Sequence, residues 1–253
     1  GRIGDQIVKF PFTMGHECSA IVAEVGNNVT RVKPDDLVAV DPMIACLQCD
    51  QCTSKNYNRC RQQLFLGCPD QMEGCLCEYI VMPEENCFKI GDSMSLIQAA
   101  LVEPLSIGIY AGTLLKNKHS PAIGILGSGP IGLSVLLAAK HAGVEAICAT
   151  DKINERLQTA KKVGAAWIGN PDKDDVIKAI GHNSLDAVFE CCGDQDALDQ
   201  AIELLQPGGE LLIVGIPDAN RVSLDIHKLR RKEISIQNVR RQNLCIQIAI
   251  DII

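Results

Sequence analysis

The sequence has 253 residues, of which 47% are hydrophobic and 22% charged, a balance typical of globular proteins. A net charge of −7 argues against binding to nucleic acid, and no apolar stretch is long enough to cross a membrane. We therefore expect neither a nucleic acid nor a membrane as a partner. The length predicts two domains with well-buried cores. Thirteen cysteines without a signal peptide favour a reducing compartment, and we expect the protein to be cytoplasmic.

Residues 1–106 have the pattern of a β-rich domain. Short apolar runs at 20–25, 37–40 and 79–82 predict strands, and turn signals such as Lys33-Pro34-Asp35-Asp36 separate them. Short strands joined by turns favour a small barrel over a sandwich.

A cysteine-rich loop at 46–60 interrupts this domain with the spacing C-x2-C-x2-C-x7-C. Its thiols belong to Cys46, Cys49, Cys52 and Cys60. Four thiolates so close in sequence can surround one tetrahedral zinc ion in a closed, structural site. The loop is polar and cannot fold by burial alone, so a metal would order it. Two disulfides, or four unrelated thiols, are the alternatives.

From residue 107 onward, strands and helices alternate. Strands are predicted at 122–126, 146–150, 187–190, 211–214 and 234–239, and helices at 130–142, 154–163 and 196–205. Repeated β-α-β units with short connections predict a parallel sheet covered by helices on both faces.

A dinucleotide fingerprint joins the first strand and helix of this half. Gly127, Gly129 and Gly132 form G-x-G-x-x-G, and Asp151 ends the next strand at roughly the 20-residue distance typical of the motif. Such a loop presents amides and a helix N-terminus to a pyrophosphate. Asp151 favours NAD over NADP because its carboxylate binds ribose hydroxyls and repels a 2′-phosphate.

Two observations leave alternatives open at this point. Lys152 and Arg156 carry cations that could meet a 2′-phosphate, which weakens the preference for NAD. A glycine-rich turn in a non-binding α/β domain is the other interpretation of the motif.

Among the acidic and histidine residues, the pair His16-Glu17 and the lone Glu103 are candidate metal ligands, although each taken alone is more often part of a polar turn.

Taken together, these motifs carry a family resemblance. Gly15-His16-Glu17, the four-cysteine loop, Glu103-Pro104-Leu105-Ser106 and the 127–132 loop with Asp151 occur in one order along the chain. In that order the chain resembles the zinc-containing medium-chain alcohol dehydrogenases, most of all the sorbitol (polyol) dehydrogenase branch. The resemblance extends from residue 1 to residue 243.

The resemblance implies an α/β fold with two domains and a known chemistry. Residues 1–106 would form a GroES-like catalytic domain, 107–239 a doubly wound, parallel-sheet Rossmann domain, and 240–253 the start of a return to the catalytic domain. The enzyme would oxidise a secondary alcohol of a polyol to a ketone with NAD⁺. Zinc would act as a Lewis acid on the alcohol oxygen.

The resemblance also implies roles for individual residues. His16 and Glu17 would bind a catalytic zinc, and Glu103 would hold a zinc-bound water beside the substrate. Arg240 and Arg241 would lie near the substrate or the nicotinamide ribose. The cofactor would contact Gly127, Gly129, Pro130, Ile131, Gly132, Asp151, Lys152, Arg156, Val214, Gly215, Ile216, Val239 and Arg240.

The sequence departs from the family pattern at both ends. The family places its first catalytic zinc ligand in a Cys-Gly-x-Ser-Asp stretch before the point that matches Gly1, and this stretch is absent. We therefore expect a fragment that holds one tight zinc and oxidises polyols negligibly by itself. A different alcohol or amino alcohol as substrate, and a silent zinc- and NAD-binding scaffold, are the competing hypotheses. The strand at 234–239 is expected late in the sheet, where an exposed edge could pair with another subunit, and the resemblance implies a dimer or tetramer.

Overall fold

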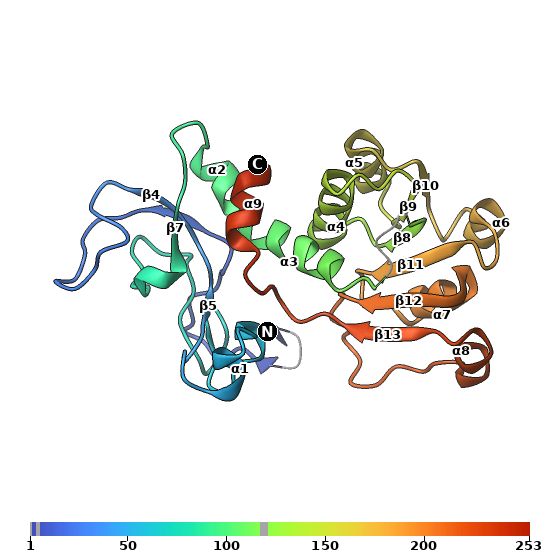
Figure 1. The fold of residues 1–253 in the computed structure, drawn as a ribbon, viewed down its shortest axis with the longest axis horizontal. Helices are drawn as coiled ribbons and strands as arrows, with labels where there is room; N and C mark the ends of the chain where they lie inside the picture. Colours follow the sequence, from blue (N-terminus) through green and yellow to red (C-terminus); the bar gives the residue numbers. More distant parts are fainter. Residues whose placement is uncertain (1, 4–5, 117–120) are drawn as a thin grey trace. The chain divides into compact units, whose positions relative to one another are not determined.

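The computed structural model describes residues 2–3, 6–116 and 121–253. They divide into two compact units (Figure 1). The β-rich unit runs to Ser106 and also includes Arg241–Ile253, and the α/β unit comprises Ile107–Arg240. Within the described ranges, no helix is both long and apolar enough to span a membrane.

The α/β unit is built on a six-stranded sheet in which every neighbouring pair is parallel. The strand order is β10-β9-β8-β11-β12-β13. This is the doubly wound order whose chain direction reverses beside the first strand, and ligands of such sheets bind at the carboxyl ends of the strands flanking that reversal. The strands are β8 (Ile123–Leu126), β9 (Ile147–Thr150), β10 (Trp167–Gly169), β11 (Leu185–Glu190), β12 (Leu205–Ile213) and β13 (Ser235–Asn238).

Both faces of this sheet are buried because helices pack on each side of it. Ile123 and Ile125 of β8 join the core that α4 supplies with Val135 and Leu136, whereas Leu126 joins the core on the other face. That second core includes residues of α6 and α7. The helices are α4 (Pro130–His141), α5 (Asn154–Val163), α6 (Val176–Ile180), α7 (Gln195–Leu204) and α8 (Ile226–Lys232).

The β-rich unit contains short antiparallel strands. β3 (Ser19–Ile21), β4 (Leu37–Val40) and β7 (Cys87–Lys89) form one sheet. Two smaller pairs are β5 (Met43–Ile44) with β6 (Leu64–Phe65), and β1 (Arg2–Ile3) with β2 (Gln6–Ile7). The remaining elements are α1 (Asp50–Thr53), the 3-10 turns η1 (Tyr57–Arg59) and η2 (Glu84–Asn86), α2 (Leu96–Ala100) and α9 (Ile246–Ile252).

One helix, α3 (Val102–Thr113), begins in the β-rich unit and continues into the α/β unit. α2 precedes it and begins with a capping box, in which the Ser95 hydroxyl accepts the Gln98 N–H and the Gln98 side chain accepts the Ser95 N–H. The chain between these helices is short. It sets Glu103 in the first turn of α3, where its side chain is buried.

The prediction of a strand at 79–82 is wrong, although the alternating pattern behind it is present in the structure. Its alternation is correct, since Ile80 and Met82 pack on the core while Tyr79 and Val81 are 78% and 90% exposed. However, no described strand pairs with it, so the segment lies outside any sheet. The structure also contains β10, α6 and α8, which the sequence analysis did not predict.

Candidate metal centres and dinucleotide site

A glycine turn sets His16 and Glu17 just before β3. Gly15 has a φ of +100°, and its carbonyl oxygen accepts the Cys75 N–H at 3.0 Å. A Cβ at Gly74 would lie 2.3 Å from the Met14 carbonyl carbon, so the two segments approach too closely for any side chain there. The backbone that carries His16 is therefore fixed by a second segment distant in sequence.

His16, Glu17 and Glu103 form the first cluster of candidate metal ligands. One ligand atom from each of the three lies within 4.8 Å of the others. Glu103 is only 3% exposed, and its Oε2 atom is buried without a hydrogen-bond partner among the described residues. An unsatisfied buried carboxylate oxygen is costly, and a cation or a cation-bound water would satisfy it. The three side chains therefore fit a zinc ion.

The pKa shifts of His16 and Glu103 agree with a bound zinc ion. Burial lowers the pKa of His16, which favours the neutral imidazole that a metal requires. Burial, followed by the charges of Glu17 and Asp41, raises the pKa of Glu103 to about 8 in the metal-free protein. A divalent cation would relieve this crowding of carboxylates.

Arg241 lies in the same unit and is held by two side chains. Its guanidinium carbon is 3.5 Å from the centre of the Phe65 ring, and Nη1 donates to Gln63 Oε1 at 2.8 Å. The Phe65 ring is also 5.2 Å from the His16 ring. The Arg241 guanidinium thus stacks on a ring that also neighbours a candidate zinc ligand.

Asp41 anchors the chain beside Arg241. Gln242, which follows Arg241 in the chain, donates from Nε2 to Asp41 Oδ2 at 2.9 Å, and its side-chain oxygen accepts the Cys245 N–H at 2.9 Å. Sequence reasoning missed Gln63, Phe65, Asp41 and Gln242. No motif links these polar and aromatic residues, so only their tertiary proximity reveals them.

The second candidate metal centre is the four-cysteine loop. The Sγ atoms of Cys46, Cys49, Cys52 and Cys60 all lie within 4.8 Å of one another, and Cys49 Sγ is 3.6 Å from Cys52 Sγ. All thirteen cysteines of the chain are free thiols in the structure. Hydrogen bonds from the backbone of Arg61 and Cys52 lower the pKa of Cys49 to about 6. Four converging sulfurs, one of them readily ionised, fit a closed tetrahedral zinc site.

The glycine fingerprint has the geometry that a pyrophosphate requires. Gly127 has a φ of +96°, and Gly129 is the N-cap of α4, with Pro130 at its first turn. A Cβ at Gly132 would lie 1.8 Å from the Gly127 carbonyl oxygen. By contrast, a Cβ at Gly129 would meet only the end of the Arg156 side chain, at 3.8 Å. The space beside Gly129, at the N-terminus of α4, is therefore open except for the end of Arg156, as an incoming phosphate needs.

Asp151 lies at the carboxyl end of β9 and is only 8% exposed. Its Oδ2 accepts the Ser128 N–H and its Oδ1 accepts the Ile153 N–H, both at 2.8 Å. Arg156 Nη1 is 3.7 Å from Oδ2, whereas Lys152 Nζ is 3.3 Å from Asp194. Of the two cations predicted near the ribose, Arg156 is therefore beside Asp151, and Lys152 pairs with another acid.

The remaining predicted cofactor residues follow β12 and β13. The N–H groups of Val214 and Gly215 donate to the Glu190 carbonyl oxygen, and Ile216 is largely exposed. The Val239 N–H donates to the Ile213 carbonyl oxygen at 2.8 Å. Arg240 is the last residue of the α/β unit and Arg241 the first of the return segment, so these two arginines predicted near the substrate belong to different units.

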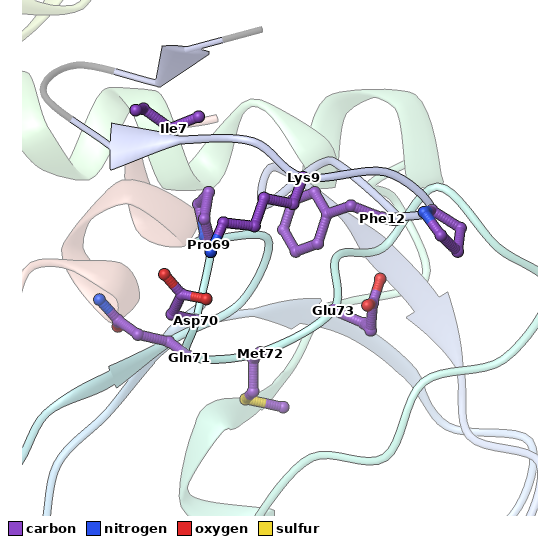
Figure 2. A pocket seen from close by; sticks show the side chains of 9 residues that line it. Ile7, Lys9, Phe12, Pro69, Asp70, Gln71, Met72 and Glu73 are labelled. Atoms are coloured by element: carbon purple, nitrogen blue, oxygen red, sulfur yellow. The ribbon is translucent and has the colours of Figure 1, made fainter.

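An open hollow of about 350 Å³ also lies in the β-rich unit. Lys9 extends over Asp70 on one side of it, and Glu73 lies on the other (Figure 2). Glu73 accepts the Thr13 N–H, which ties the two walls together. None of the predicted site residues lines this hollow, so it is separate from both metal-ligand clusters.

Family models match both halves of the chain. One for an alcohol dehydrogenase GroES-like domain matches residues 1–92, and one for a zinc-binding dehydrogenase matches residues 130–253. The fold expected from the sequence, a GroES-like domain and a parallel-sheet Rossmann domain, is confirmed. Fold and ligand clusters together define a zinc-dependent dehydrogenase.

Known relatives narrow the class. A sorbitol dehydrogenase of Bacillus subtilis is 38% identical over 245 residues, which cover 95% of this chain and 69% of that protein. The structure of a 2R,3R-butanediol dehydrogenase from Bacillus subtilis aligns with a TM-score of 0.84 at 34% identity, covering 96% of this chain and 70% of the other. A zinc-binding dehydrogenase from Sinorhizobium meliloti bound to NADP aligns with a TM-score of 0.89 at 27% identity, covering 96% and 72%. The chain belongs to the zinc-containing alcohol dehydrogenase family, in its polyol branch.

Proposed function

We propose that the protein oxidises a secondary alcohol of a polyol or vicinal diol to the ketone, with NAD⁺ as hydride acceptor. The buried and unpartnered Oε2 of Glu103, beside His16 and Glu17, is the observation that carries this proposal. The similarity to a sorbitol dehydrogenase and to a butanediol dehydrogenase supports the substrate class, because both substrates carry adjacent hydroxyl groups.

The metal would be bound by His16 Nδ1 or Nε2 and a Glu17 carboxylate oxygen, with Glu103 holding it through a water. When bound there, zinc supplies Lewis-acid activation of an alcohol oxygen, and NAD⁺ in the α/β unit accepts the hydride. Glu103 Oε2 would accept a hydrogen bond from a water or a substrate hydroxyl.

Arg241 would bind a second hydroxyl group of the substrate. Its guanidinium is fixed on Phe65 and Gln63, so binding a substrate hydroxyl there would cost little further side-chain entropy. Guanidinium N–H groups donate well to hydroxyl oxygens. This role would select diols over simple alcohols.

The cofactor would lie along the carboxyl edge of the parallel sheet. The first turn of α4 would receive the pyrophosphate, and Asp151 would accept hydrogen bonds from the adenosine ribose. The carboxylate of Asp151 favours NAD⁺, and the nearby Arg156 is the feature that would help NADP⁺.

The test measures the oxidation of a panel of polyols and simple alcohols by the full-length protein and by its His16→Ala variant. We expect oxidation of diols, and its loss in His16→Ala while the Kd for NAD⁺ stays within about twofold, since a distinct unit binds the cofactor. The His141→Ala variant is a matched control, because this exposed histidine lies in the last turn of α4. Full activity in His16→Ala would contradict the assignment.

We also propose a homo-oligomer in a reducing compartment. β13 is the last strand of its sheet, and one of its edges has no described partner. An edge strand can pair with a second copy. The four thiols arranged for zinc would stay reduced in a reducing compartment such as the cytoplasm. Light scattering that detects only monomers at micromolar concentration would contradict the oligomer.

A further inference from the structure

A short segment, 241–243, brings the chain back into the β-rich unit without forming a helix or a strand. At its first position, the Arg241 guanidinium stacks on the Phe65 ring, and this ring neighbours the His16 ring. At its last position, Asn243 binds the four-cysteine loop. The segment therefore connects the surroundings of the two candidate metal centres.

Both ends of the Asn243 amide bind the backbone of the loop. Its Oδ1 accepts the Tyr57 N–H at 2.9 Å, and its Nδ2 donates to the Lys55 carbonyl oxygen at 2.9 Å. The bonded residues are 186 and 188 positions apart in the sequence. Since one side chain uses its donor and its acceptor on the same stretch of loop, the two bonds fix the return segment against that stretch.

The stretch that Asn243 binds lies between two of the candidate zinc ligands. The Lys55 N–H donates to the Cys52 carbonyl oxygen at 2.9 Å, and the Cys60 N–H donates to the Tyr57 carbonyl oxygen at 2.9 Å. Cys52 and Cys60 are both buried. A zinc ion held by their thiolates would therefore order the backbone groups to which Asn243 binds.

Gln63 provides a second, weaker connection between the loop and the return segment. Its Oε1 accepts from Arg241 Nη1 at 2.8 Å, and its Nε2 donates to the carbonyl oxygen of the buried Asn58 at 3.5 Å. Asn58 also belongs to the loop. The guanidinium of Arg241 and the backbone that follows it are thus both connected to residues 46–60.

The backbone of the return segment needs this support. Arg241 has a φ of +52° and Leu244 a φ of +59°, in the left-handed region that residues with a Cβ seldom adopt. Such conformations persist only where surrounding contacts hold them. Asn243 lies between these two residues, so its bonds to the loop help to maintain the conformation that places the Arg241 guanidinium.

We propose that Asn243 is a positioning residue that makes polyol binding by Arg241 depend on the metal in the four-cysteine loop. The inference rests on the proposed function, in which Arg241 binds a hydroxyl group of the substrate. With the metal bound, the loop is ordered and Asn243 holds the return segment against it. Without the metal, residues 46–60 loosen and the guanidinium loses part of its support. The closed metal site would then serve substrate affinity as well as stability.

The first measurement separates KM from kcat in the full-length protein, with the polyol of the panel that has the lowest KM. Asn243→Ala should raise KM roughly 10-fold, because two hydrogen bonds are lost. The kcat and the Kd for NAD⁺ should stay within about twofold, since the change affects substrate binding alone. Asn28→Ala is the matched control: this exposed asparagine lies in a turn of the same unit, and its loss should leave KM unchanged.

Cys49→Ser tests whether the loop acts through Asn243. Loss of the loop metal should raise KM by at least the factor seen in Asn243→Ala, again with the Kd for NAD⁺ within about twofold. In the double variant, KM should rise no further than in Cys49→Ser, because both changes break the same connection. A double-variant effect equal to the product of the two single effects would contradict the proposal.

A third measurement does not depend on activity. Cobalt(II) bound by four thiolates has an intense visible absorption, so its loss from the loop to a chelator can be followed directly. Cys49→Ser, which should lack this absorption, identifies it. Asn243→Ala should release cobalt several-fold faster than the wild-type protein, because the loop has lost its two bonds to the return segment, whereas Asn28→Ala should match the wild type.

An unchanged KM in a Cys49→Ser protein that has lost the loop metal would overturn the inference, and so would equal cobalt release from Asn243→Ala and the wild type. If Asn243→Ala does not fold, Asn243→Asp replaces it. This variant keeps the acceptor for the Tyr57 N–H but not the donor to Lys55, and should raise KM about threefold. If the wild-type protein oxidises no polyol while Asn243→Ala still releases cobalt faster, the proposed function fails and takes the substrate role of Asn243 with it.

Discussion

The Arg241 guanidinium stacks on the Phe65 ring, with its central carbon 3.5 Å from the ring centre. Phe65 belongs to β6, and Arg241 begins the segment that returns to the same unit. Cation–π contacts of this kind are worth about 0.5–2 kcal/mol and also fix the plane of the guanidinium. The ring therefore determines where the donors of Arg241 point.

We predict that Arg241→Ala raises KM for a polyol by roughly 10- to 100-fold, because a charge-assisted hydrogen bond contributes about 1.5–3 kcal/mol. Steady-state kinetics at saturating NAD⁺ measure this change. Arg241→Lys should recover only part of it, since an ammonium group lacks the planar fork. An unchanged KM in Arg241→Ala would remove Arg241 from the substrate site.

The second prediction concerns cofactor choice. Asp151→Ala should weaken NAD⁺ binding by about 1–3 kcal/mol through the lost hydrogen bonds, and NADP⁺ should gain relative to NAD⁺. Arg156→Ala is the informative counterpart, because it removes the cation 3.7 Å from Asp151 and should disfavour NADP⁺. Titrations with both dinucleotides give the ratio. The prediction fails if Asp151→Ala keeps the wild-type preference.

The third prediction concerns the four-cysteine loop. Cys49→Ser should release one zinc per chain and lower the melting temperature, because the polar loop has little apolar core of its own. NAD⁺ affinity should persist, since the α/β unit has two hydrophobic cores of its own. Metal analysis and thermal denaturation measure the two effects. Cys148→Ser, outside the loop, is the control and should keep the zinc.

The fourth prediction concerns pH and Asp41. Burial raises the pKa of Asp41 from its ordinary value of 3.8 to about 6 in the folded protein. Between these values the folded state binds more protons than the unfolded state, so the free energy of unfolding falls as pH rises from about 4 to about 6. The contribution is about 1–3 kcal/mol.

Asp41→Asn should remove this part of the pH dependence. Denaturant unfolding of the metal-free proteins at several pH values gives the difference in free energy between wild type and variant. That difference should change across the window from pH 4 to pH 6 and be flat above it. A constant difference throughout would show that Asp41 does not titrate as described.

Much of the fold could be predicted from the sequence, because its signals are local. The alternation of apolar runs with helical patterns identified five strands of the parallel sheet, and Asn154–Val163 was predicted with its observed bounds. The short elements β10, α6 and α8 were not predicted, since elements of so few residues show too little periodicity to be recognised in the sequence. The segment 79–82 had the right alternation but lacked a neighbour to pair with.

The candidate sites also divide into those that a local sequence motif determines and those that depend on the tertiary structure. The thiol spacing within 46–60 and the glycines from Gly127 to Gly132 are determined by sequence alone, because each ligand set lies in one short segment whose local geometry brings its atoms together. The approach of Glu103 to His16 and the stacking of Arg241 on Phe65 were decided only by the tertiary structure. These contacts join segments far apart in the chain. Their proximity follows from the packing of strands and helices around shared cores, which no local spacing encodes.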